Sequence, residues 1–167
     1  REYVEEWEMD DGTPVTLRPI KSEDEPLEFE LFDTLSKESW RYRFFGPMKD
    51  VDHEDMVRFT NIDYEREMAI VGIVRDGGEK KMIGVGRLIV NQEKNDGEFA
   101  VLIGDPWQGE GLGEKLLDSI IGIAEDKKLK KIWGTILKNN TPMINLCKKL
   151  GFKTEKEIIF PEEKQSK

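Results

Sequence analysis

Three glycines lie within five residues in the segment Gln108–Gly113, which reads Gln-Gly-Glu-Gly-Leu-Gly and follows the apolar run Phe99–Ile103. Glycine lets a backbone turn sharply and approach a bound group closely. The first turn of a helix adds unpaired N–H groups and the positive end of the helix dipole. The residues that follow carry an apolar stripe at helical spacing, namely Leu112, Leu116, Ile120 and Ala124. The segment therefore predicts a strand, a glycine turn and a helix whose start can bind an anion.

The spacing of these glycines excludes two common phosphate-binding loops. A P-loop requires Lys and then Ser or Thr after its last glycine, and neither follows Gly113. The dinucleotide fingerprint Gly-x-Gly-x-x-Gly fails because Glu114 occupies its last position. A glycine turn that only joins a strand to a helix is the alternative interpretation.

A single carboxylate stands in the apolar run before the glycines. Glu98 is the only acidic residue in segment 97–103 and precedes Gln108 by ten residues. Burial beside Phe99 would raise the pKa of its carboxyl and make it a better proton acceptor near pH 7. Glu98 is therefore our candidate general base. A glutamate that faces solvent at a strand edge is the alternative.

Three other titratable side chains are weaker candidates. Glu65 and Glu67 are reserve carboxylates for the same role. The only histidine, His53, stands in the sequence Asp-His-Glu-Asp at the predicted start of a helix. We expect His53 to lie on the surface.

The elements that must position these residues follow from hydrophobic periodicity and turn residues. The expected strands are residues 3–9, 14–20, 67–75, 81–91, 97–104, 132–137 and 152–160. The expected helices are residues 23–36, 52–62, 110–127 and 141–150. Residues 40–47, Trp-Arg-Tyr-Arg-Phe-Phe-Gly-Pro, are expected to form an aromatic and basic loop. This order predicts an α/β fold with a mixed sheet, in which early strands are antiparallel and later ones are joined by helical crossovers.

Composition limits the class of protein. The chain has 167 residues, of which 37% are hydrophobic and 37% charged, and a formal charge of −9. This length predicts a single domain, residues 1–167, with a frayed tail at 162–167. The acidic charge argues against a nucleic-acid partner. With no apolar run of about 18 residues, no secretory signal and one cysteine, we expect a cytoplasmic protein without a membrane partner. We also expect no metal.

Two spaced motifs resemble the GNAT N-acetyltransferases. Gln108, Gly111 and Gly113 match the family's Gln/Arg-x-x-Gly-x-Gly/Ala motif. Segment 140–152, Asn-x-x-Met-x-x-Leu-Cys-x-Lys-x-Gly-Phe, is similar to its Asn-x-x-Ala-x-x-Leu-Tyr-x-Lys-x-Gly-Phe signature. The resemblance implies the GNAT fold, a mixed, mostly antiparallel, twisted sheet of about seven strands with about four helices.

The same resemblance implies acetyl-CoA as the co-substrate. Loop amides would hold its pyrophosphate, and the strand before the loop would pair with the pantetheine amides. A bulge would free the Val101 or Leu102 amide for the oxyanion. Glu98 takes the position of the family's catalytic glutamate. The implied cofactor-binding residues are Val101, Leu102, Ile103, Gln108, Gly109, Glu110, Gly111, Leu112, Gly113, Glu114 and Asn140.

Cys147 departs from the family pattern. It stands where many members carry a tyrosine that protonates the departing thiolate. A free cysteine in a helix is usually an inert part of the core. We therefore expect Cys147 to serve packing, with water or direct release of the thiolate in place of the acid.

Further segments look like the catalytic domain of the bacterial Pat-type protein lysine acetyltransferases. They include Arg18-Pro19-Ile20, Arg43-Phe44-Phe45 and Glu98-Phe99-Ala100-Val101. In that group the domain often joins an acyl-CoA synthetase-like or cyclic-nucleotide-binding region, and a start at Arg1 is consistent with excision from such a chain. The expected function is acetylation of protein lysines by direct attack in a ternary complex. A GNAT that acts on a small amine or polyamine, and a non-catalytic acyl-CoA sensor, are the alternatives.

Overall fold

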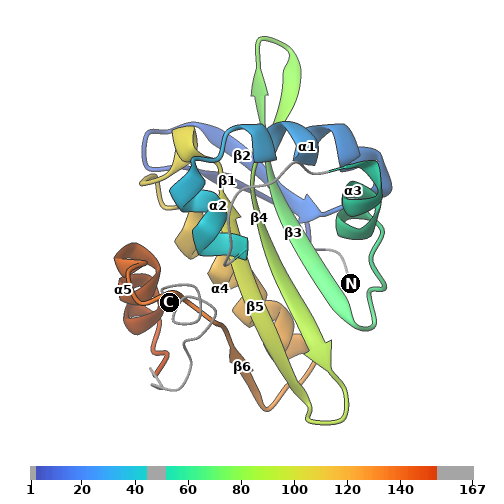
Figure 1. The fold of residues 1–167 in the computed structure, drawn as a ribbon, viewed down its shortest axis with the longest axis vertical. Helices are drawn as coiled ribbons and strands as arrows, with labels where there is room; N and C mark the ends of the chain where they lie inside the picture. The colour runs from blue at the N-terminus through green and yellow to red at the C-terminus, as the bar shows by residue number, and fades with distance from the viewer. Residues whose placement is uncertain (1–2, 45–51, 154–167) are drawn as a thin grey trace.

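A six-stranded sheet forms the centre of the protein (Figure 1). The structure is a computed structural model that describes residues 3–44 and 52–153. The strands lie side by side in chain order, and every neighbouring pair is antiparallel except β5 and β6, which are parallel. Their bounds are β1 Glu5–Glu8, β2 Pro14–Pro19, β3 Glu67–Asp76, β4 Glu79–Asn91, β5 Asp96–Ile103 and β6 Lys131–Trp133. The predicted α/β class with a mixed sheet is confirmed.

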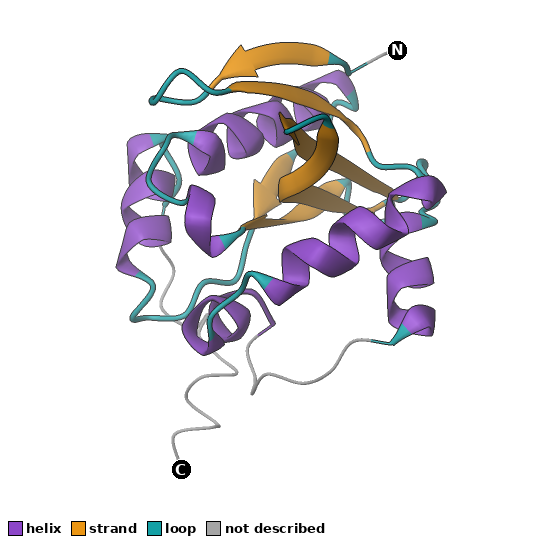
Figure 2. Ribbon diagram, turned by 90° about the horizontal axis from the view of Figure 1, so that it is seen from above, coloured by secondary structure: helices purple, strands orange, loops and turns teal. Residues whose placement is uncertain are grey.

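Helices cover both faces of this sheet (Figure 2). Helix α4 packs on one face through its apolar stripe, whose members Leu116 and Ile120 are fully buried. Three shorter helices close the other face around Phe32 and Met56. The helices are α1 Glu25–Asp33, α2 Lys37–Phe44, α3 His53–Thr60, α4 Leu112–Asp126 and α5 Thr141–Lys149, with short 3-10 turns η1 Ser22–Asp24 and η2 Asp105–Trp107.

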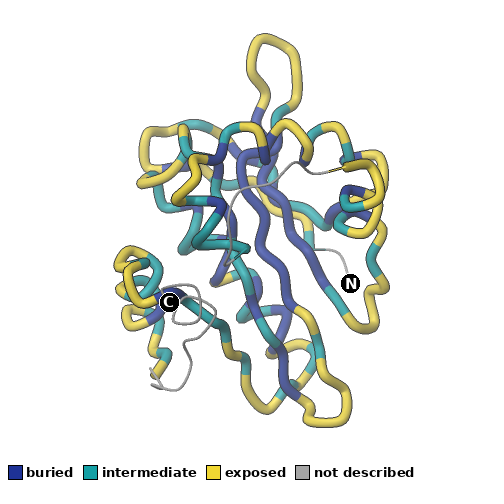
Figure 3. The backbone as a smooth tube through the Cα atoms, viewed as in Figure 1, coloured by how far each residue is buried: buried dark blue, intermediate teal, exposed yellow. Residues whose placement is uncertain are grey.

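The central strands are buried along most of their length (Figure 3). Residues 68–74 of β3 and 82–88 of β4 are all buried, which agrees with their near-continuous apolar sequences. A strand covered on both faces needs apolar side chains on both sides, so alternation disappears. The exception is Arg87 of β4, a buried cation within this apolar run.

The predicted loop at 40–47 is wrong in its described part, because residues through Phe44 belong to helix α2. The Ser36 hydroxyl accepts the Ser39 N–H at 3.0 Å and so caps the first turn of the helix. One turn apart, Trp40 and Phe44 both pack edge-on against Phe32, with ring centroids 6.0 and 5.8 Å away. This aromatic cluster stabilises a helix that the sequence pattern alone did not predict. It also explains why the described residues hold five helices and not four.

The predicted bounds at the C-terminal end also differ from the structure. Strand β6 spans three residues, whereas 132–137 was expected. Of the predicted strand 152–160, residues 152 and 153 are not in a strand, and the remainder and the tail 162–167 lie outside the described residues. Within the described segments, no helix is both long enough and apolar enough to span a bilayer.

The chain leaves β6 through Gly134, directly over the ring of Phe99. A Cβ on Gly134 would lie 2.6 to 2.8 Å from three atoms of that ring. Phe99 is held from another side by Phe152, with ring centroids 5.2 Å apart. The ring therefore has little room to move, and only glycine fits at this crossing.

We expect Gly134→Ala to lower the free energy of unfolding by about 1–3 kcal/mol, the usual cost of overpacking. Gly122→Ala is the matched control, because a Cβ at this position of α4 meets nothing within 4 Å. That control should raise stability by about 0.5–1 kcal/mol, the helix preference for alanine over glycine. Urea unfolding of both variants measures the difference. Equal stabilities would show that the crossing over Phe99 is not tight.

Candidate acyl-transfer site

Strands β5 and β6 pair only briefly and then diverge (Figure 1). The pairs are Asp96 with Lys131, Gly97 with Ile132, and Glu98 with Trp133. Beyond Glu98, the edge of β5 that faces β6 has no strand partner in the described part of the chain. This open edge runs from Glu98 to Ile103, about 17 Å at the usual rise of a strand. Its length is similar to that of an extended pantetheine arm.

The N–H groups on this open edge can be assigned from one printed bond at its end. Gly104 donates its N–H to the carbonyl of Ile83, at 2.9 Å, on the β4 side. Because the backbone groups of a strand alternate between its two neighbours, the N–H groups of Ile103 and Val101 face the open side. The residues expected to meet the pantetheine arm therefore lie on a free edge, with Leu102 buried in the core between them.

The bulge expected at Val101 or Leu102 is not present. Strand β5 pairs with β4 residue for residue from Asp96 to Ile103. The register shift in this part of the sheet lies between β3 and β4, at Gly72 and Ile73. The divergence of β6, and not a bulge in β5, leaves the Val101 amide free, whereas the Leu102 N–H faces β4.

The glycine loop forms a row of unused N–H groups at the start of α4. Gly109 and Gly111 have φ angles of +83° and +89°, which L side chains rarely adopt. Gly111 is the N-cap residue and has no side chain to satisfy the first turn. Among the described residues, no acceptor takes the N–H groups of residues 109–114. Free N–H donors at a helix N-terminus can bind an anion, and binding of a cofactor by this loop stays a prediction.

Two motif side chains have structural contacts in this arrangement. Gln108 donates its Nε2 to the carbonyl of Ile103 at 3.0 Å and to the hydroxyl of Ser39 at 3.2 Å, and so joins the loop, β5 and α2. Asn140 is the N-cap of α5, where its Oδ1 accepts the Met143 N–H at 3.4 Å. Direct contact of either side chain with a cofactor stays a prediction.

The side chains around the loop are acidic and partly neutralised by lysines. A Cβ on Gly111 would lie 3.1 Å from a carboxylate oxygen of Asp10, whose N–H donates to the Glu110 carbonyl at 3.0 Å. Glu114 pairs with Lys149 of α5 at 2.8 Å. The groups of this loop that could attract an anion are therefore its backbone N–H groups and the positive end of the α4 dipole.

Glu98 lies where β5 and β6 separate. Its cross-strand neighbours are Ile89 on β4 and Trp133 on β6. Burial raises the pKa of the Glu98 carboxyl, and the positive charge of Arg43 opposes that rise. A half-buried carboxyl with a raised pKa suits a group that accepts a proton near neutral pH.

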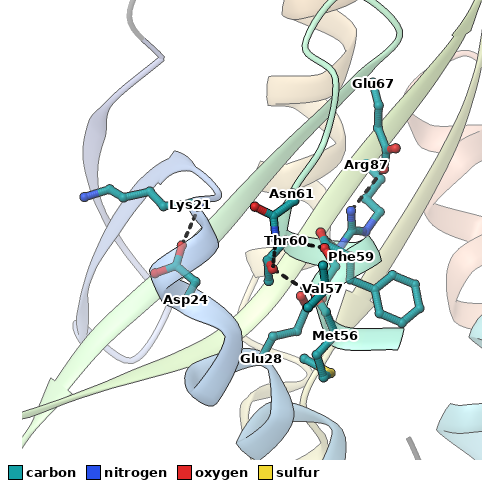
Figure 4. Close-up of polar contacts among 10 residues, drawn as sticks. All are labelled: Lys21, Asp24, Glu28, Met56, Val57, Phe59, Thr60, Asn61, Glu67 and Arg87. Carbon is teal, nitrogen blue, oxygen red and sulfur yellow. Dashed lines mark hydrogen bonds and ion pairs between the residues drawn. The ribbon is translucent and has the colours of Figure 1, made fainter. Parts of the chain in front are cut away.

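Two arginines to which the sequence assigned no role in the site lie on the same face of the sheet as Glu98. Arg87 donates to Glu28 of α1 at 3.1 Å, to Glu67 of β3 at 3.0 Å and to the Phe59 carbonyl at 2.8 Å (Figure 4). Arg43 lies in α2 with its guanidinium 4.8 Å from the centre of the Phe44 ring. Burial and the like charge of Arg87 lower the pKa of Arg43 to about 10, so it stays charged at neutral pH. The sequence does contain a clue to Arg87, because it is a charged residue inside an otherwise apolar predicted strand.

An open groove of about 1760 Å³ connects Glu98 with the C-terminal helix. Its wall includes Trp133, Phe152 and Cys147. Cys147 is buried, and burial raises the pKa of its thiol to about 11. The thiol is therefore protonated at neutral pH and releases its proton less readily than an ordinary thiol, as a packing residue would.

The remaining acid–base candidates have other contacts. His53 is exposed at the first turn of α3, where its Nδ1 contacts the Glu25 carboxylate, and its expected surface position is confirmed. Glu67 is held by Arg87, and Glu65 is exposed in a turn. In the two described segments, no group of three or more His, Cys, Asp and Glu side chains could hold a metal ion.

Comparisons with known proteins show the family of this chain. The family model described as an acetyltransferase (GNAT) domain matches residues 15–153. The acetyltransferase PA5475 of Pseudomonas aeruginosa is 32% identical over 144 residues, which cover 86% of this chain and 77% of that protein. The solved GNAT domain of S. lividans PAT has a TM-score of 0.83 at 24% identity, covering 93% of this chain and 91% of that one.

A further solved structure is a spermidine N-acetyltransferase from Vibrio cholerae in complex with CoA and spermine. Its TM-score is 0.68 at 24% identity, covering 84% of this chain and 82% of that one. At these identities the two structural likenesses show the fold alone.

The charge of Arg43 generates a prediction for the titration of Glu98. Arg43→Met should move the pKa of the Glu98 carboxyl upward, because the cation that opposes the effect of burial is lost. Arg43→Lys should keep it near the wild-type value. A carbon-13 NMR titration of the Glu98 side-chain carboxyl measures both.

Arg58→Met is the matched control, because Arg58 also stacks on an aromatic ring, Phe59, at 5.4 Å, but its side chain is exposed. It should leave the Glu98 titration unchanged. An unchanged titration in Arg43→Met, with the fold intact, would show that Arg43 does not act on Glu98.

Proposed function

This chain belongs to the GNAT acetyltransferase family, and from that premise we propose that it transfers the acetyl group of acetyl-CoA to the ε-amine of protein lysines. The reaction is a direct attack in a ternary complex, with Glu98 as general base. The observation that carries this proposal is the single open edge of β5, which has the unused N–H groups of the glycine loop near one end and the Glu98 carboxylate at the other.

The two ends of this edge suit the two ends of an acyl-CoA. The N–H groups of residues 109–114 would bind the pyrophosphate, because they are donors without acceptors at a helix N-terminus. The N–H groups of Val101 and Ile103 would pair with the amides of the pantetheine arm as a neighbouring strand would. The thioester would then lie near Glu98, the last residue of β5 that pairs with β6.

The chain's own groups supply the steps of the transfer. An alkylammonium has no lone pair, so Glu98 first accepts its proton, directly or through a water. The neutral amine forms the new C–N bond at the thioester carbonyl, and a strand N–H stabilises the negative oxygen. The C–S bond then breaks, and the thiolate leaves with CoA. The nitrogen of the new amide gives its second proton to water, and water protonates the thiolate, because burial has made the Cys147 thiol a poor acid.

A small polyamine is the second candidate acceptor. The formal charge of −9 favours the approach of a cationic substrate, and the fold is similar to that of the Vibrio cholerae spermidine N-acetyltransferase. A non-catalytic acyl-CoA sensor is the third, from another class of protein. We favour lysine because Arg18-Pro19-Ile20, Arg43-Phe44-Phe45 and Glu98-Phe99-Ala100-Val101 resemble the Pat-type protein lysine acetyltransferases. We place the reaction in the cytoplasm.

One experiment separates the three candidates. The chain is incubated with acetyl-CoA and either a cell lysate or spermidine, and acetylated products are identified by mass spectrometry. A protein acetyltransferase modifies lysines of folded proteins, whereas a polyamine enzyme turns over spermidine faster. A sensor binds acetyl-CoA but leaves every amine unmodified.

The glycine loop predicts how a larger side chain affects acetyl-CoA binding. A Cβ on Gly113 meets only Leu146 and Ile103, at 3.8 and 4.0 Å, so Gly113→Leu should fold but fill the gap between β5 and α5. Calorimetry should show affinity for acetyl-CoA at least about tenfold weaker, the scale of a lost hydrogen bond to a charged group. Gly122→Leu, farther along the same helix, should bind normally. Equal affinities in the two variants would reject the loop as the phosphate site.

The role of Glu98 predicts a specific defect in Glu98→Gln. Glutamine keeps the size but cannot accept the proton, so turnover should fall on the order of a hundredfold while acetyl-CoA affinity changes less than about twofold. The residual rate should climb with pH toward the lysine pKa of about 10.4, where solution supplies the neutral amine. Thiol release measured over a range of pH tests the two statements about the rate, and calorimetry tests the statement about affinity.

Glu65→Gln is the control, because Glu65 is exposed in a turn, and its rate should match the wild type. Profiles of equal shape for Glu98→Gln and the wild type would remove Glu98 from the mechanism. The next residue to test would then be Glu67.

A further inference from the structure

Two large apolar side chains flank Glu98 and are exposed to solvent. Ile89 is 50% exposed and Trp133 is 42% exposed, although both lie in strands of the central sheet. In the described residues only four other large apolar side chains are exposed, and these are Val4, Phe29, Val57 and Tyr64. Apolar side chains that line an open groove around a polar group can form part of a ligand-binding surface.

The sheet register places these side chains on one face, in one row. Glu67 of β3 is opposite Ile89 of β4, Ile89 is opposite Glu98 of β5, and Glu98 is opposite Trp133 of β6. Directly opposed residues point to the same face, with Cβ atoms about 5 Å apart in the antiparallel pairs and neighbouring strands about 4.8 Å apart throughout the sheet. Ile89, Glu98 and Trp133 also line the same open groove. The carboxylate therefore stands between two apolar walls.

The other polar members of this face already have partners. Glu67 accepts a hydrogen bond from Arg87, which is itself bound to Glu28 and to the Phe59 carbonyl. The described residues give the carboxylate of Glu98 no hydrogen bond or ion pair, and Arg43 is the charged group that acts on its titration. A cation that enters the row from the groove thus meets one unengaged carboxylate with apolar surface on both sides.

We propose that Ile89 and Trp133 bind the alkyl stem of the acceptor amine beside Glu98, and so select a primary amine on an unbranched chain of several methylenes, such as a lysine side chain. This inference rests on the proposed function. The ammonium group is complementary in charge to Glu98, and the methylenes are complementary to the two apolar walls. The ring of Trp133 can also contact the cation directly, because tryptophan is the aromatic residue that binds cations best.

A series of amines tests this selection. With acetyl-CoA saturating, kcat/KM is measured for ethylamine, butylamine and hexylamine. Burial of a methylene between Ile89 and Trp133 should raise kcat/KM by up to about fourfold per added carbon. Trp133→Ala and Ile89→Ala should each reduce the ratio of hexylamine to ethylamine by at least about threefold. The ratio is independent of the fraction of folded enzyme.

Matched controls remove exposed apolar residues elsewhere. Phe29→Ala on α1 pairs with Trp133→Ala, and Val57→Ala on α3 pairs with Ile89→Ala. Both controls should keep the wild-type ratio. Two results would overturn the proposal. One is a hexylamine to ethylamine ratio of kcat/KM near one in the wild type, and the other is a ratio that Trp133→Ala and Ile89→Ala both leave unchanged.

A binding measurement separates this proposal from the proposed function. Hexylammonium, but not ethylammonium at the same concentration, should shift the indole N–H resonance of Trp133, assigned with Trp133→Phe. If no amine is acetylated, the proposed function fails, and this shift alone decides whether the stem site exists. No shift with either amine would overturn the site, whatever the turnover.

Discussion

Strand β6 pairs with β5 over only three residues, and the candidate site depends on that limit. Gly134 carries the chain away from the sheet over the Phe99 ring, where no side chain fits. The edge of β5 beyond Glu98 consequently keeps its donors free, while α4 begins beside the end of the same strand. One early separation of two strands thus creates the open edge, places Glu98 where the strands part and exposes Trp133.

The sequence was most informative where local patterns determine local structure. The glycine turn, the amphipathic α4 and the apolar β5 were predicted nearly to the residue, because turn conformation and helical spacing are properties of short segments. Helix α2 was missed, since its stability comes from Phe32, which precedes it in the chain by several residues and packs against Trp40 and Phe44. The open edge of β5 was attributed to a bulge, because no local pattern records where a neighbouring strand ends.

The electrostatics of the site could not be read from residue types. Segment 127–149 contains seven lysines, which suggests a basic surface. In the structure, however, Lys149 pairs with Glu114, and the Asp10 carboxylate lies next to Gly111 of the loop. The free donors at the loop are backbone groups, which carry no signature except glycine. Near Glu98, the opposing effects of burial and of Arg43 arise from the packing of α2 against β5, an arrangement set by the fold.

Arg87 connects four segments that are far apart in the chain. Its guanidinium donates hydrogen bonds to a buried glutamate on α1, to a backbone carbonyl of α3 and to a second glutamate on β3. Loss of the arginine alone would leave a buried carboxylate without its cation, and loss of Glu28 alone would leave the opposite defect. Such changes are strongly non-additive. Positions 28, 67 and 87 should therefore behave in evolution as one inherited unit, exchanged together or left alone, while the exposed surface around them diversifies freely.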